Sequence, residues 1–102
     1  MAHYLVRAKP LDLAVLRQKL DEEAFKGIRP FGEELDGCLR SAKITPDGWV
    51  TWEEVCFCTP PLAQERSVLD QHFTDLTTQQ LAGGEGWQRI ADLPDLWDNA
   101  AL

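Results

Sequence analysis

The four residues Thr45-Pro46-Asp47-Gly48 constrain the fold of this chain more than any other part of its sequence. Proline presets φ for the first central position of a turn, aspartate suits the second, and glycine accepts the positive φ of the third. Strand-like runs precede and follow the motif, at residues 38–44 and 49–58. The sequence therefore predicts a β-hairpin closed by a type I turn with a glycine bulge.

The turn also predicts which side chains of the hairpin share a face. Because side chains alternate along a strand, the even-numbered residues point one way and the odd-numbered residues the other. The even face carries apolar side chains such as Val50 and Trp52, so we expect it to meet the helices. The register that the turn implies places these residues opposite one another: Thr45 and Trp49, Ile44 and Val50, Ala42 and Trp52, Arg40 and Glu54, and Cys38 and Cys56.

The N-terminal third of the chain predicts one strand and one helix. Residues 3–9 alternate like a strand, and Pro10 ends it because proline cannot donate to a β-ladder. After Asp12, which suits a helix N-cap, apolar residues recur at steps of three and four and predict a helix that ends at Gly27. Residues 28–37 contain two glycines and a proline, so we expect a connection there.

The C-terminal half predicts a second helix and a last strand. Residues 59–61, Thr-Pro-Pro, suit the start of a helix, and an apolar stripe follows. The threonines of 74–78 favour a strand that begins within this stretch. Residues 87–93 are expected to form the last strand, and the acidic tail around Trp97 a short amphipathic piece that needs a docking surface.

The 102 residues have room for one hydrophobic core, so we expect a single domain over residues 1–102. The expected order of elements, β-α-β-β-α-β with a C-terminal strand or hairpin extension, predicts an α+β fold with an antiparallel sheet and both helices on one side. In this layout the chain resembles the ferredoxin-like dimeric α+β barrels. That resemblance implies the architecture of a group that includes small monooxygenases and isomerase-like enzymes, but architecture alone does not give function.

The sheet face turned away from the helices predicts self-association. A sheet face left to water is normally polar, but five large apolar side chains are expected on this one. We therefore predict a homodimer that packs sheet on sheet. The alternative is that the tail around Trp97 folds over the same face within one chain. The five apolar residues are Leu5, Leu39, Trp49, Val55 and Phe57.

Three cysteines, Cys38, Cys56 and Cys58, are expected on the even face of the hairpin. Three readings remain open: buried reduced thiols with a structural role, a redox pair, or a site for a soft metal. Zinc normally takes four ligands, and the positions expected for His3 and His72 leave neither histidine near the thiols. We favour the structural role and predict no metal site.

Four residues on the open face, His3, Arg7, Trp49 and Glu53, are the candidate ligand-binding residues. Across a sheet-to-sheet dimer they would form an apolar cavity with a few polar groups, which is the usual anatomy of a small-molecule site. Arg7 suits bidentate binding of a carboxylate or phosphate, and Glu53 or His3 suits acid–base chemistry. An ordinary role as solvated or interface charges is the alternative for each.

Composition narrows the classes of partner. A net charge of −7 disfavours nucleic-acid binding, and no apolar run approaches the ~20 residues needed to span a bilayer. The N-terminus lacks the pattern of a secretion signal, and an odd, small number of cysteines favours the reducing cytoplasm. We expect a cytoplasmic, noncatalytic module that binds a small ligand or a partner protein without a cofactor. The alternative is a cofactor-free enzyme acting on a small aromatic or anionic substrate.

Overall fold

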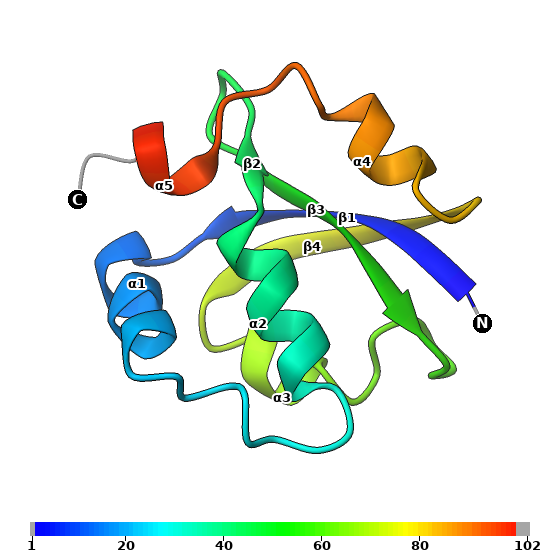
Figure 1. The fold of residues 1–102 in the computed structure, drawn as a ribbon, viewed down its shortest axis with the longest axis horizontal. Coiled ribbons are helices and arrows are strands. Elements are labelled where there is room, and N and C mark those ends of the chain that lie inside the picture. The colour runs from blue at the N-terminus through cyan, green and yellow to red at the C-terminus, as the bar shows by residue number, and fades with distance from the viewer. Residues whose placement is uncertain (1, 100–102) are drawn as a thin grey trace.

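In a computed structural model, which describes residues 2–99, the chain is an α+β protein with a four-stranded antiparallel sheet and five helices (Figure 1). The strands lie in the order β2-β3-β1-β4, and each neighbouring pair is antiparallel. The elements along the chain are β1 (Ala2–Pro10), α1 (Leu13–Asp21), α2 (Gly32–Arg40), β2 (Lys43–Ile44), β3 (Val50–Cys56), α3 (Arg66–Leu69), β4 (Phe73–Leu81), α4 (Glu85–Arg89) and α5 (Leu96–Asn99).

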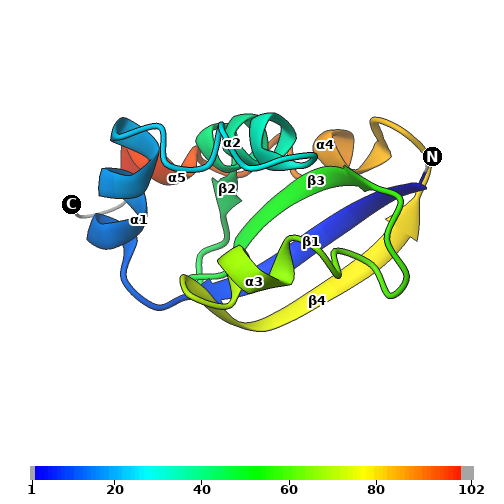
Figure 2. The same cartoon turned by 90° about the horizontal axis from the view of Figure 1, so that it is seen from below.

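The core lies between the sheet and helices α1, α2 and α3, which Figure 1 shows below the strands, whereas α4 lies above them. The prediction that even-numbered side chains of the hairpin face the helices is confirmed, because Trp52 is fully buried, whereas the odd-numbered Phe57 is 79% exposed. In Figure 2, α3 lies in front of β1 and β4, and α2 runs along the β3 side of the sheet. The fully buried apolar core residues include Val6, Leu16, Leu20, Leu35, Leu39, Val50, Trp52 and Leu62.

The Thr-Pro-Asp-Gly hairpin forms with the predicted register. Ile44 pairs with Val50, the Thr45 amide donates to the Trp49 carbonyl at 2.8 Å, and Gly48 has φ of 91°. A positive φ at this position suits glycine, which has no Cβ to clash. The prediction of the turn and its strand pairing is therefore correct.

The first strand of the hairpin is much shorter than predicted, because residues 38–40 belong to helix α2. The predicted pairs Cys38–Cys56 and Arg40–Glu54 are therefore wrong. Arg40 instead donates to Asp36 Oδ2 at 2.8 Å, one helical turn away. The strand-like alternation predicted for the hairpin does not continue back into residues 38–40. There the four-residue spacing of Leu35 and Leu39 is that of a helix.

Helix α2 occupies the edge of β3 where a longer β2 would have paired. The Cys38 thiol donates to the Glu53 carbonyl at 3.1 Å, and Glu34 Oε2 accepts from the Val55 amide at 3.1 Å. Unpaired backbone groups on an edge strand invite association with other strands. Side chains of α2 satisfy these two groups, so this part of the edge is protected within the chain.

Two further predictions in the C-terminal half are corrected. The predicted long second helix is only the short α3, and the chain from Phe73 onward forms β4, where threonines favour extended backbone. The predicted last strand at 87–93 is replaced by α4 and a turn. Glycine at position 84, with φ of 85°, starts this helix.

The chain after β4 covers part of the sheet face that was predicted to be open. Helix α4 contacts β1 and β3, and the following segment returns to β2, where the Ile44 amide donates to the Pro94 carbonyl. Trp97 Nε1 donates to the Leu39 carbonyl at 2.8 Å, which docks the predicted amphipathic tail. Of the five apolar residues assigned to this face, Leu39 is buried in α2 and Phe57 alone is largely exposed.

No helix within residues 2–99 has the length and apolar character to cross a bilayer.

The buried His72 predicts that stability falls in mild acid. It is 7% exposed, its ring meets the Phe25 ring edge-on at 5.7 Å, and burial first and then the Lys19 charge lower its pKa from 6.5. A lowered folded-state pKa means that the unfolded chain binds the proton more tightly, so stability is lost as pH falls below about 6.5. His72→Leu should remove this part of the loss between pH 7 and pH 5, measured by urea unfolding at each pH. An unchanged pH dependence would contradict the assignment.

Candidate functional site

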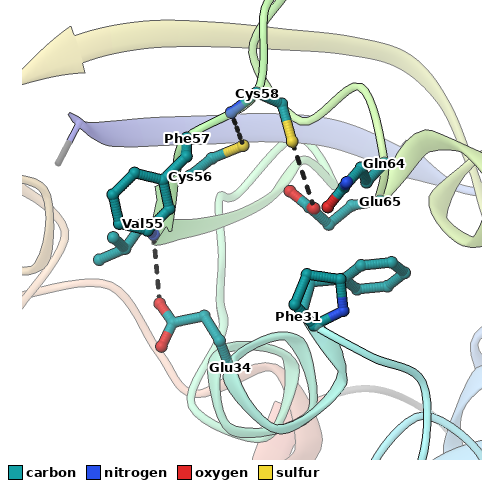
Figure 3. A pocket seen from close by; sticks show the side chains of 9 residues that line it. Phe31, Glu34, Val55, Cys56, Phe57, Cys58, Gln64 and Glu65 are labelled. Carbon is teal, nitrogen blue, oxygen red and sulfur yellow. Dashed lines mark hydrogen bonds between the residues drawn. The ribbon is translucent and has the colours of Figure 1, made fainter.

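A groove of about 430 Å³ opens between the start of α2, the end of β3 and the loop 57–65 (Figure 3). Its volume is in the range of small-molecule sites, and its wall is mostly apolar. Among the described residues that line it, two are acidic and none is basic. The lining residues are Pro30, Phe31, Glu34, Val55, Cys56, Phe57, Cys58, Gln64 and Glu65.

The end of β3 builds one wall of the groove because its side chains continue to alternate after the ladder ends. Cys56 points inward and is 4% exposed, whereas Phe57 points out and is 79% exposed. The Cys58 amide donates to Cys56 Sγ at 3.1 Å, which turns the chain back toward the core. The loop then returns Glu65 to the same place, with Oε1 at 4.0 Å from Cys58 Sγ.

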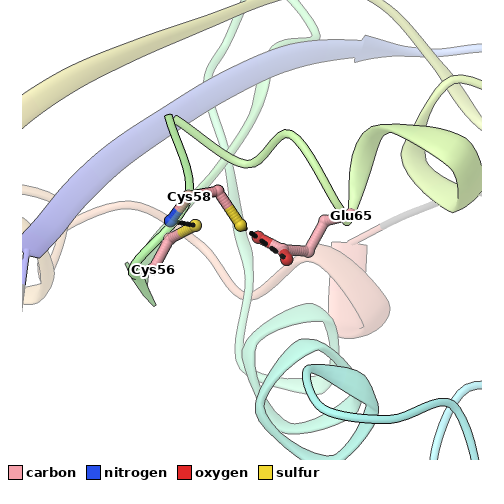
Figure 4. Close-up of side chains that lie close together, drawn as sticks. All are labelled: Cys56, Cys58 and Glu65. Carbon is pink, nitrogen blue, oxygen red and sulfur yellow. Dashed lines mark hydrogen bonds between the residues drawn. The ribbon is translucent and has the colours of Figure 1, made fainter. Parts of the chain in front are cut away.

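Cys56, Cys58 and Glu65 form a compact cluster at the inner end of the groove (Figure 4). One ligand atom from each, the two Sγ atoms and a carboxylate oxygen, lies within 4.8 Å of the others. Burial is the main reason that the pKa of the Cys56 thiol is raised to about 11. All three cysteines are free, but the predicted three-thiol cluster divides, because Cys38 lies on α2 against the β3 edge.

Glu54 adjoins Glu65 beneath this cluster. Both side chains are buried, at 0% and 2% exposed, and Trp52 Nε1 donates to Glu54 Oε1 at 2.8 Å. Burial is the main cause that raises the pKa of Glu54 to about 8; the Trp52 hydrogen bond opposes the shift, and the Glu65 carboxyl adds to it. The two carboxyls share a hydrogen bond, and Oε2 of each glutamate has no other partner within residues 2–99.

The four residues predicted to bind a ligand come together as two separate pairs. His3 Nδ1 donates to Glu53 Oε2 at 3.0 Å, while the Arg7 guanidinium lies over the Trp49 ring, 4.4 Å from its centroid. His3 and Arg7 are four residues apart on β1, or about 13 Å at the rise of a strand. None of the four lines the groove described above.

The Glu53 carboxylate accepts hydrogen bonds from backbone amides at the start of α4. Oε1 accepts from the amides of Gly86 at 2.7 Å and Trp87 at 3.2 Å, and Oε2 accepts from Gly84 at 2.9 Å. Burial alone raises the pKa of this carboxyl, but these amides and His3 outweigh it, so the pKa is lowered from 4.5. The carboxylate therefore anchors α4 to the sheet.

Sequence reasoning missed Glu34 and Glu65 as site residues. Glu65 lies within the segment expected to form a long helix, where its charge predicts an outward position, but it is buried in the turn before α3. The one available signal was an acid seven residues after Cys58, the second cysteine of the Cys-x-Cys pair. No protein-family model, curated protein or solved structure matches this chain.

Proposed function

We propose that this protein is a noncatalytic module whose groove binds a small ligand with an apolar body and a cationic group. The observation that carries the proposal is the chemistry of the lining: apolar and aromatic side chains, with carboxylates as the charged groups. A cation near an aromatic face and a carboxylate gains from both. The two carboxylates would repel an anionic ligand.

The outer part of the groove supports this choice of ligand. Phe57 exposes most of its ring, although apolar side chains of this size are usually covered. Phe31 and Val55 extend the apolar surface, and Glu34 stands beside them (Figure 3). Glu34 Oε2 accepts from the Val55 amide at 3.1 Å and lies 3.5 Å from Cys38 Sγ, so its position is fixed by the fold.

The binding proposal is favoured over the enzyme alternative by the contacts of the expected acid–base residues. Glu53 holds α4 through three backbone amides, and His3 donates to the same carboxylate. A cofactor-free enzyme acting at these residues stays a prediction, as does the homodimer, for which Phe57 is the one largely exposed apolar residue of the predicted face. The three free thiols support a reducing, cytoplasmic location.

We also propose that the β-α-β-β-α-β core belongs to the ferredoxin-like class. The strand order β2-β3-β1-β4 supports this assignment, because β1 and β2 are parallel with β3 between them, and β3 and β4 are parallel with β1 between them. These are two split βαβ units. The extra helix α2 and the α4–α5 segment elaborate that core.

The groove proposal predicts that arylalkyl amines bind more tightly than matched carboxylates. Isothermal titration should detect 2-phenylethylamine and related amines but not 3-phenylpropionate. Phe57→Ala should weaken amine binding about tenfold, as expected from a cation–π contact and lost apolar area. Leu11→Ala is the matched control, because Leu11 is 59% exposed and does not line the groove. Equal binding of amines and carboxylates, or no amine binding across the set, would refute the proposal.

A further inference from the structure

We propose that Cys56, Cys58 and Glu65 bind a zinc ion at the inner end of the groove. The inference goes beyond the proposed binding of an organic ligand, because zinc takes Glu65 and the two thiols at the inner end of the groove, and Glu34 and the aromatic side chains of the outer part remain for the amine. It is carried by the juxtaposition of three ligand atoms from two segments, the end of β3 and the loop that follows it (Figure 4).

The distances within the cluster are close to those of a metal centre. In tetrahedral zinc sites the metal lies about 2.3 Å from sulfur and about 2.0 Å from oxygen, which places ligand atoms roughly 3.5 Å apart. The three ligand atoms here lie within 4.8 Å of one another. The Cys58 Sγ and Glu65 Oε1 atoms are 4.0 Å apart, about 0.5 Å more than this spacing.

A buried pair of carboxyls, Glu54 and Glu65, is the second, independent observation. Glu65 is 2% exposed, and within residues 2–99 its Oε2 has no partner other than the carboxyl of Glu54, with which Glu65 shares a hydrogen bond. A buried carboxylate costs free energy, since it has lost its hydrogen bonds to water. A cation held by the two sulfur atoms and Glu65 Oε1 compensates the negative charge of this buried carboxyl pair.

The donor set selects the class of metal. Two sulfur donors favour zinc and other thiophilic ions over magnesium or calcium, which prefer oxygen alone. On binding, each thiol loses its proton to solvent, so one Zn²⁺ replaces two protons and the sulfur–metal bonds form without any change of oxidation state. Three protein ligands leave a fourth position for water on the groove side.

The test is a titration of the intact, chelator-treated protein with Co²⁺ and then Zn²⁺. One Co²⁺ should bind per chain with the intense near-ultraviolet absorption of cobalt–thiolate bonds, and Zn²⁺ should abolish it. Cys58→Ser should weaken Zn²⁺ binding by about 100-fold or more, because a metal ligand is lost. Cys38→Ser is the matched control: it also replaces a thiol near the groove, but one outside the cluster, and should bind like the parent.

A second measurement needs no variant and so does not depend on folding of a mutant. Zn²⁺ should slow alkylation of Cys56 and Cys58 by iodoacetamide, read by mass spectrometry, while the rate at Cys38 stays the same. Equal alkylation rates with and without Zn²⁺, or cobalt–thiolate absorption that depends on Cys38, would overturn the proposal. Phe57→Ala separates the two hypotheses, since it should weaken amine binding and leave Zn²⁺ binding unchanged.

Discussion

Gly32→Ala should lower the free energy of unfolding by about 3 kcal/mol or more, the upper range for forcing extra atoms into a packed site. A Cβ at this position would lie 2.0 Å from the Phe25 carbonyl oxygen and 3.1 Å from the Lys26 carbonyl oxygen. Both obstacles are backbone atoms, so no side-chain rotation relieves the clash. The Gly32 amide also donates to the Ile28 carbonyl at 2.7 Å, which ties the start of α2 to the turn before it.

Gly37→Ala is the matched control within the same helix. No described atom lies within 4 Å of a Cβ built at Gly37, and alanine in a helix interior is favoured over glycine by up to about 1 kcal/mol. We therefore expect Gly37→Ala to be neutral or stabilising. Urea unfolding of both variants, followed by circular dichroism, measures the difference. Equal stabilities would contradict the close approach of α2 to the 25–26 backbone.

The parts of the fold that the sequence predicted correctly depend on short-range rules. The turn at 45–48 needs four residues with defined φ preferences, and the pairing of Ile44 with Val50 follows directly from it. Helix α1 starts where Asp12 was expected to cap it, because Asp12 Oδ1 accepts from the amides of Ala14 and Val15. The burial of Trp52 follows from alternation within one strand.

The parts that were wrong depend on contacts between distant segments. Residues 32–40 contain two glycines, which are poor helix formers, and α2 is stabilised by burial of Leu35 and Leu39 and by its contacts with the β3 edge. The segment 87–93 has an ambiguous local pattern, and α4 forms where Glu53 binds the amides at its start. No local pattern reveals such a partner.

The candidate site was only half predictable for the same reason. Cys56 and Cys58 were expected on one face because they are two residues apart in a strand-like run. The position of Glu65 depends on the path of the loop 57–65, which no periodicity sets. The pair His3–Glu53 agrees with the predicted odd face, since both side chains belong to it, but the role of Glu53 as the anchor of α4 became visible only with the sheet and helix together.

Glu53→Gln should lower the free energy of unfolding by about 2–3 kcal/mol at pH 7, the cost of leaving buried hydrogen-bonding groups unsatisfied. Glutamine has nearly the same shape, but one oxygen becomes an NH₂ group that faces amide donors of Gly84 or Gly86 and Trp87. The charge that strengthens these hydrogen bonds is lost as well.

Two controls and the pH dependence separate this cause from a general effect of removing charge. His3→Ala should cost less, because the three backbone donors to Glu53 remain, and Glu33→Gln on the exposed side of α2 should change little. The lowered pKa of Glu53 contributes stability above pH 4.5 that is lost as pH falls through the folded-state value. The gap between wild type and Glu53→Gln should therefore narrow in urea titrations at pH 3. A gap that is the same at pH 3 and pH 7 would show that the carboxylate does not hold α4 on the sheet, because only its ionised form accepts from all of these donors.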